Sequence, residues 1–87
     1  MSDADPVAAS DAPDGRSQVE LDVRNLGPPK PLKQTLEATA DLADDAVLLQ
    51  YNDRKPQHLY PKLEDRGLAH DTVETDDATV TVIWREG

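Results

Sequence analysis

The chain has 87 residues, enough for one small domain with a single hydrophobic core. It contains no cysteine, which excludes disulfides, thiolate metal sites and thiol catalysis, and it has no apolar run near the roughly 18 residues of a membrane span. The formal net charge of -9 argues against non-specific DNA binding, because such binding needs a basic surface.

The acidic composition allows two interpretations. It fits a protein of concentrated salt solutions, where charge repulsion is screened and a charged surface keeps the chain in solution, and it also fits an ordinary acidic protein. The chain begins MSDADPVAAS, with neither a basic start nor an apolar segment of a secretory signal, so we expect a cytoplasmic protein.

Residues 1–18 are rich in Asp, Ala, Ser and Pro and show no hydrophobic period. This composition is typical of disorder, so we expect a disordered acidic N-terminal tail. The folded domain is then expected over residues 19–87.

The first predicted unit of the domain is a strand, a turn and a helix. Apolar and charged residues alternate over 19–24, which predicts a strand with one buried face. Residues 25–30 contain Gly27 and two prolines and predict a turn. Pro31 suits the first position of a helix, and the apolar spacing that follows predicts a helix over 31–42.

The remaining pattern predicts a strand over 46–52, a helix over 56–66 ending at Gly67, and strands over 68–74 and 79–85. Pro61 is unfavourable inside a helix, so the regular part of the second helix is expected to begin near it. The order is βαβαββ. Because βα units connect parallel strands with right-handed crossovers, both helices should cover one face of the sheet, giving a two-layer α/β (α+β) sandwich.

The segment 21–32, LDVRNLGPPKPL, resembles the strand, turn and helix start of the TusA/SirA-like superfamily, and the resemblance extends over about 19–87. More closely, the chain is similar to a cysteine-less branch of unknown function that is common in haloarchaea. The residues that carry the resemblance are Leu21, Asp22, Leu26, Pro29, Pro31, Leu32, Asn52, Asp53, Leu59, Pro61 and Gly67.

The resemblance implies a mixed four-stranded sheet under two helices, with the last strand between the second and the third. The sulfur carriers of this superfamily hold sulfur as a persulfide on a cysteine, and Pro28 stands at that position here, so the activity is not carried over. The related branch has a histidine in an Asn-Asp-His stretch where this chain has Arg54, so a metal or haem contact of that histidine would be lost as well.

A candidate binding site follows from the predicted topology. Ligands of βαβ units sit beyond the carboxyl ends of the strands, where helix N-termini add partial positive charge. The residues expected there are Arg24, Asn25, Lys30, Lys33, Asp53, Arg54, Lys55 and His58. We expect a cationic pole that contacts a small anionic ligand or, with less support, RNA phosphates. The alternative is that these charges are only solvated surface.

Other sites have weaker support. His58 and His70, with Asp53 or Asp71, lack the spacing of zinc ligands, so no metal and no cofactor is expected. No nucleophile–base pair is visible, and no enzymatic activity is expected. The aromatic residues are expected in or near the core.

A sheet covered by helices on one face leaves its second face bare. Leu48 and Ile83 are expected on that face, where they could form a weak dimer or partner contact or be ordinary exposed side chains. The leading hypothesis is a small binding or regulatory module, monomeric or weakly dimeric, that meets a protein partner or an anionic ligand. The second is an accessory protein of sulfur or redox metabolism that docks to sulfur carriers through residues 27–31 without carrying sulfur.

Overall fold

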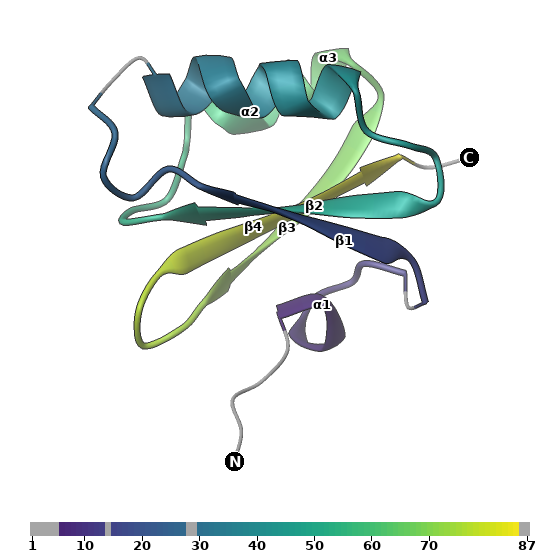
Figure 1. Cartoon of the computed structure of the whole chain (residues 1–87), viewed down its shortest axis with the longest axis horizontal. Helices are drawn as coiled ribbons and strands as arrows, with labels where there is room; N and C mark the ends of the chain where they lie inside the picture. The colour runs from purple at the N-terminus through teal and green to yellow at the C-terminus, as the bar shows by residue number, and fades with distance from the viewer. Residues whose placement is uncertain (1–5, 14, 28–29, 86–87) are drawn as a thin grey trace.

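A four-stranded mixed sheet forms the centre of the computed structural model, which describes residues 6–13, 15–27 and 30–85 (Figure 1). Its strands are β1 (Ser17–Asp22), β2 (Ala46–Asn52), β3 (Leu68–Glu74) and β4 (Thr79–Arg85), in the order β1-β2-β4-β3. β1 and β2 are parallel, and β4 is antiparallel to both β2 and β3. The predicted α/β sandwich and the central place of the last strand are confirmed.

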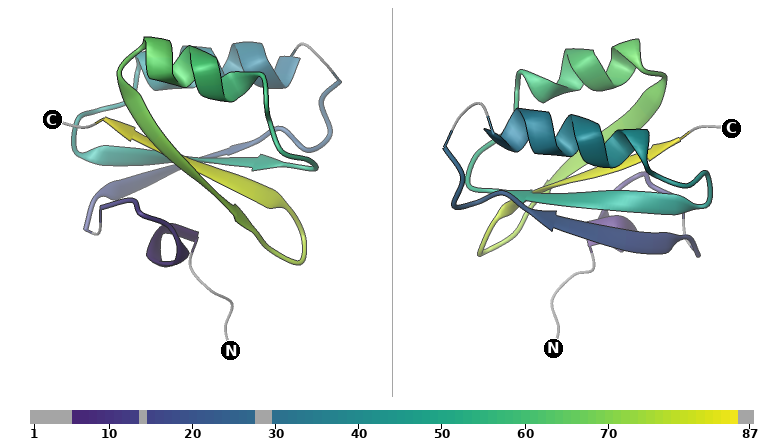
Figure 2. Two further views of the ribbon diagram at one scale, coloured as in Figure 1. Left: turned by 180° about the vertical axis from the view of Figure 1, so that it is seen from behind. Right: turned by 45° about the horizontal axis from the view of Figure 1, so that its top comes forward.

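Two helices, α2 (Lys30–Ala40) and α3 (Leu59–Asp65), lie side by side on one face of the sheet (Figure 2). Their apolar side chains pack with those of the strands into one core cluster. Its buried members are Leu42, Ala46, Leu48, Leu59, Leu63, Leu68 and Ile83. Leu48 and Ile83 therefore lie under the helices, and the prediction that they occupy the second face is wrong.

Local chemistry accounts for the ends of the helices. Pro61 is the third residue of α3, so its missing N–H belongs to the first turn, where no helical partner exists. α3 begins at Leu59 and ends at Asp65, shorter than predicted. Gly67 follows it at φ +72°, a left-handed conformation that suits glycine, and its N–H donates to the Glu64 carbonyl.

The second face of the sheet carries its own core cluster, covered by the one-turn helix α1 (Pro6–Ala9) and the residues after it (Figure 1). Its buried residues are Val7, Ala12, Val47, Leu49, Ala78, Val80, Val82 and Trp84. The structure thus differs from the predicted disordered tail over residues 6–13 and 15–18; the remaining residues of that tail, 1–5 and 14, lie outside the described residues. A segment with few apolar residues is ordered here because it covers an apolar sheet face.

The first strand also differs from its prediction. β1 covers Ser17–Asp22 rather than 19–24, and Val19 remains 46% exposed because β1 is an edge strand. Val23, just after it, is fully buried, and its N–H donates to the Tyr51 carbonyl at 2.9 Å. The edge position therefore exposes a face that simple alternation predicts to be buried.

Candidate functional site

Three loops meet at one end of the sheet. The carboxyl ends of the parallel strands β1 and β2 lie together, and β4 begins there because Asn52 pairs with Thr79. The turn between β3 and β4 therefore joins the loops that lead into α2 and α3 (Figure 1). We call this surface the loop end and define it as residues 23–27, 30–33, 53–58 and 74–78.

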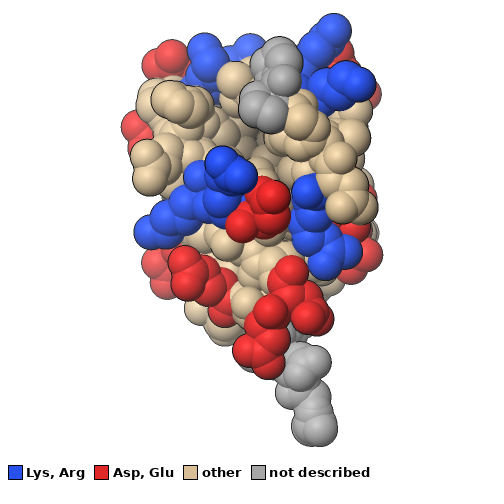
Figure 3. Space-filling view, turned by 90° about the vertical axis from the view of Figure 1, so that its left-hand side faces the viewer, with Lys and Arg blue, Asp and Glu red and all other residues tan. Residues whose placement is uncertain are grey.

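Every residue predicted for the binding site lies at the loop end and is exposed: Arg24, Asn25, Lys30, Lys33, Asp53, Arg54, Lys55 and His58. Figure 3 shows this face, with Lys and Arg across its upper and middle parts and Asp and Glu dominating the lower part. Among the described residues, no ion pair joins the loop before α2 to the loop before α3. Pro28 and Pro29 of the predicted turn lie outside the described residues.

Arg24 is already occupied by a neighbour. Its Nε donates to Asp22 Oδ1 at 2.9 Å and its Nη2 to Asp22 Oδ2 at 2.7 Å, which makes a two-pronged ion pair. These hydrogen bonds lower the pKa of Asp22 to about 2 and raise the pKa of Arg24. Arg24 would have to leave this pair to bind an external anion.

The other cations of the loop end are less constrained than Arg24. Arg54 Nε lies 3.5 Å from Asp53 Oδ1, with the Arg54 side chain 82% exposed, so the pair is loose and well solvated. Lys30, Lys33 and Lys55 are exposed and make no ion pair with any described residue. These four side chains are the cations that the loop end can offer to a partner.

A shallow, open hollow of about 530 Å³ lies beside Arg54 and Lys55. Its lining residues are Asp53, Arg54, Lys55, Glu74, Thr75, Asp76, Asp77, Ala78 and Thr79. Four carboxylates and two cations thus line the hollow. The predicted cationic pole is therefore a surface of both signs: the cations lie on the helix-entry loops together with Asp53, and the other three carboxylates, Glu74, Asp76 and Asp77, lie at the β3–β4 turn.

The turn 75–78 between the two strands predicted over 68–74 and 79–85 contains two aspartates, but it is not among the residues predicted for the site. The strand order implied by the resemblance would have placed this turn at the site. If the last strand pairs antiparallel beside the second one, the turn before it must reach the carboxyl end of the second strand.

A buried polar pair lies behind the loop end, between α2 and the sheet. Gln50 on β2 is 1% exposed, and its Nε2 donates to Thr35 Oγ1 of α2 at 2.8 Å. Thr35 Oγ1 donates in turn to the Pro31 carbonyl at 2.7 Å. Gln50 Oε1 has no hydrogen-bond partner among the described residues. Such an atom carries a desolvation cost that an apolar side chain would not.

The two histidines lie apart from each other. His58 precedes α3 at the loop end, whereas His70 on β3 stacks on the Tyr60 ring at 4.7 Å, with its Nε2 3.4 Å from Glu64 Oε2. In the described part of the chain, no group of three or more potential ligand side chains could hold a metal ion. No helix there is long and apolar enough to cross a membrane.

A comparison with protein families matches residues 20–85 to the family described as uncharacterized conserved protein (DUF2249). The match covers α2, α3, nearly the whole sheet and the loop end, whereas α1 lies outside it. No curated protein and no solved structure matched the chain. Because the matched residues make up most of its length, the chain belongs to the DUF2249 family of uncharacterized conserved proteins.

Proposed function

We propose that this protein is a non-catalytic binding module that meets a protein partner through the loop end. The observation that carries the proposal is the pairing of exposed cations with a carboxylate-rich turn around one hollow. A surface of both signs fits a folded partner that presents complementary charges in a matching arrangement, since such patterns direct encounter and orientation.

The same charges count against a small free anion as the ligand. An anion held by Arg54 and Lys55 would lie next to the four carboxylates that line the hollow with them. Like-charge repulsion would offset much of the attraction, and both cations are exposed, where single charge pairs contribute little. A protein partner can place its own cations against the β3–β4 turn and so satisfies both halves of the surface.

The chemistry of the chain supports a non-catalytic role. It has no cysteine, and its described serines, Ser10 and Ser17, lie outside the loop end. Ser17 pairs with Ala46 at the start of β2, the opposite end of the sheet. Neither a thiol nor a serine hydroxyl is therefore available as a nucleophile among the described residues of the loop end.

Charge reversal tests the proposal. The variant carrying Arg54→Glu and Lys55→Glu reverses the cations beside the hollow. A matched control carrying Lys62→Glu and Arg66→Glu makes the same change in net charge on exposed residues of α3 and its C-terminal cap. Partner capture from cells should fall at least about tenfold for the first variant and stay unchanged for the control, since close charge pairs are strongly coupled. Equal capture by both variants would refute the assignment of the loop end.

An amide NMR titration in molar KCl with phosphate, a short RNA, zinc and haem separates this proposal from ligand binding. Shifts confined to residues 24–33 and 53–58 with phosphate would favour a small anion instead, because high salt leaves only interactions stronger than exposed ion pairs. We expect no saturable shifts with any of the four.

The second candidate, an accessory protein of sulfur metabolism, shares the protein-docking mode and differs in the partner. It rests on the resemblance to TusA/SirA-like proteins and would use residues 27–31, so a TusA-type carrier should shift the amide signals of Gly27 and Lys30. A carrier that shifts neither signal would leave the first candidate alone.

A further inference from the structure

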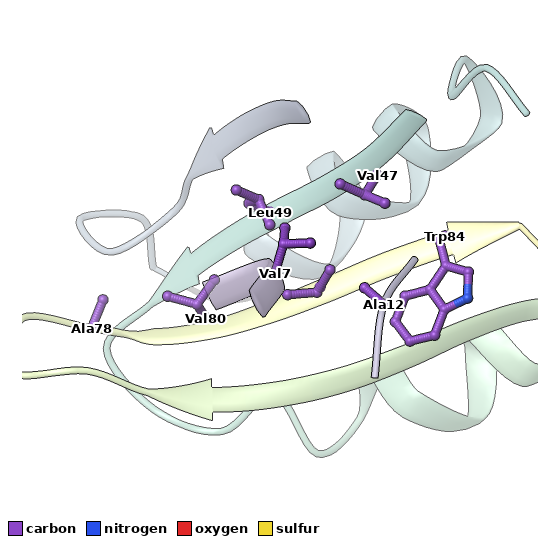
Figure 4. Close-up of a cluster of buried hydrophobic side chains, with 8 residues drawn as sticks. Val7, Ala12, Val47, Leu49, Ala78, Val80 and Trp84 are labelled. Carbon is purple, nitrogen blue, oxygen red and sulfur yellow. The ribbon is translucent and has the colours of Figure 1, made fainter. Parts of the chain in front are cut away.

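The second face of the sheet is strongly apolar, and a small segment covers it. Val47, Leu49, Val80 and Val82 are at most 1% exposed, and Trp84 is 7% exposed. The cover, residues 6–13, buries only two apolar side chains against them, Val7 and Ala12. In Figure 4, Val7 lies over Leu49 and Val80, and Ala12 lies beside Trp84.

Among the described residues, two hydrogen bonds that involve side chains link this cover and Arg16, just after it, to the sheet. The Asp11 N–H donates to Asp71 Oδ2 on β3 at 2.9 Å, and Arg16 Nη1 donates to the Arg85 carbonyl at 3.0 Å. Ser10 Oγ only closes the turn of α1 itself. Gly15, at φ +81° with open space around it, follows the cover. The segment can therefore leave the sheet as a unit without breaking any pairing between strands.

The cover and the face belong to different parts of the chain. The family match of residues 20–85 contains all of the apolar strand residues and excludes the cover. The face thus lies within the residues that match the family, whereas its cover lies outside them.

The charges around the face do not match those of the cover. Glu20 and Asp22 on β1 pair with Leu49 and Tyr51, and Asp71 on β3 pairs with Val82, so these three carboxylates border the apolar face. Asp22 is paired with Arg24, whereas Glu20 and Asp71 accept hydrogen bonds from the Tyr51 hydroxyl and the Asp11 N–H but have no cationic partner among the described residues. Residues 6–13 carry one aspartate, Asp11, and no lysine or arginine, so the cover brings a further negative charge to an acid-bordered face.

We propose that the cover, residues 6–13, is a displaceable intramolecular occupant, and that the face accepts a short basic amphipathic segment of a partner protein. Small apolar side chains of that segment take the places of Val7 and Ala12. Its lysines or arginines meet Glu20 and Asp71, which the cover cannot neutralise. This surface shares Ala78 with the loop end but uses different charged residues, so the two proposals stand or fall independently.

Two synthetic peptides probe the face of the full chain. One reproduces residues 3–16 with every aspartate replaced by lysine, and the other keeps the natural acidic sequence. Val7→Asp should release the cover, whereas Ala8→Asp introduces the same side chain at an exposed position of the same turn. Trp84 is the single tryptophan, so its emission reports directly on whether the face is covered.

Three results are expected. The Val7→Asp protein has red-shifted Trp84 emission, and Ala8→Asp does not. The basic peptide restores the original emission and binds Val7→Asp at least tenfold more tightly than it binds the natural protein or Ala8→Asp. Reversal of the border by Glu20→Lys with Asp71→Lys in the Val7→Asp protein removes the preference for the basic over the acidic peptide.

Other results overturn the proposal. The first is that the basic peptide binds Val7→Asp and Ala8→Asp with equal affinity. The second is that Val7→Asp binds the basic and the acidic peptide equally well. The third is that Val7→Asp dimerises without peptide, which would make a second copy of the chain the occupant of the face. If Val7→Asp fails to fold, the natural protein decides the matter. Saturable shifts of the Val7, Asp11 and Ala12 amides and of the Trp84 indole with the basic peptide support displacement, and their absence at millimolar peptide refutes it.

Discussion

Replacing Gln50 by methionine should stabilise the protein. Gln50 is buried to 99%, with one of its two polar atoms bonded to Thr35 and the other, Oε1, without a partner among the described residues. Methionine has a similar unbranched shape and adapts to irregular space, so the substitution removes the polar atoms with little change in packing.

The expected size of the effect comes from two opposing terms. Losing the bond from Gln50 Nε2 to Thr35 Oγ1, 2.8 Å long, costs about 1 kcal/mol. Removing the buried acceptor that has no partner gains about 1–3 kcal/mol. The free energy of unfolding should therefore rise by about 1 kcal/mol, a measurable part of the stability of so small a domain.

Urea denaturation followed by Trp84 fluorescence measures the change. Thr35→Val is the matched control, because it strands Gln50 Nε2 as well and should destabilise the natural protein by about 1–3 kcal/mol. In the Gln50→Met background the same change should cost less, and the double-mutant cycle isolates that difference. A loss of about 1 kcal/mol or more in Gln50→Met would refute the reasoning, since it would show that Gln50 Oε1 is satisfied in solution.

Three further predictions concern ionisation and helix ends. Asp22 should titrate with a pKa of about 2 by carboxyl NMR, and Arg24→Gln should return this pKa to the ordinary range. Because folding lowers the pKa from 3.8, the ion pair stabilises the fold fully above pH 3.8, and this stabilisation is lost as the pH falls towards 2. An unchanged pKa in Arg24→Gln would contradict the ion pair. Pro61→Ala should change the free energy of unfolding by less than about 1 kcal/mol, because Pro61 lies in the first turn; a rise of about 3 kcal/mol would place it in the helix interior, where proline is unfavourable. Gly67→Ala should lower the free energy of unfolding by about 1 kcal/mol in urea denaturation, because Gly67 has a φ of +72°. Gly27 has open space around it and no positive φ, so Gly27→Ala should be nearly neutral. Equal losses of stability in the two variants would show that backbone conformation is not the cause.

Several elements could be read from the chain without any tertiary information. β2, β3 and β4 have the predicted bounds, 46–52, 68–74 and 79–85, because each apolar run is bordered by polar or glycine-containing turns. α2 and α3 differ from their predictions by one to three residues at each end. The observed strand order is the one that the resemblance to TusA/SirA-like proteins implied.

The sequence did not show which face of the sheet each strand side chain occupies. Residues 47–49 and, apart from Thr81, residues 80–84 are apolar on both faces of the sheet, so their alternation does not say which face the helices cover. Leu48 and Ile83 were placed on the wrong face for this reason. Only the attachment of α2 and α3 through the crossovers decides it.

The predicted site residues do lie together at one end, because parallel strands bring their carboxyl ends to the same edge. The acidic half of that surface could not be seen from local patterns. Glu74, Asp76 and Asp77 reach it only because β4 pairs antiparallel with β2.

Local pattern and composition thus determined which residues form strands and helices, since turn residues and hydrophobic periods act over a few neighbouring positions. Tertiary packing decided the rest: which face each strand residue occupies, how the charges of three separate loops combine, and that residues 6–13 are ordered. These features depend on contacts between segments far apart in the chain, and the burial of Val7 and Ala12 is favourable only against a sheet face that the other strands have already assembled.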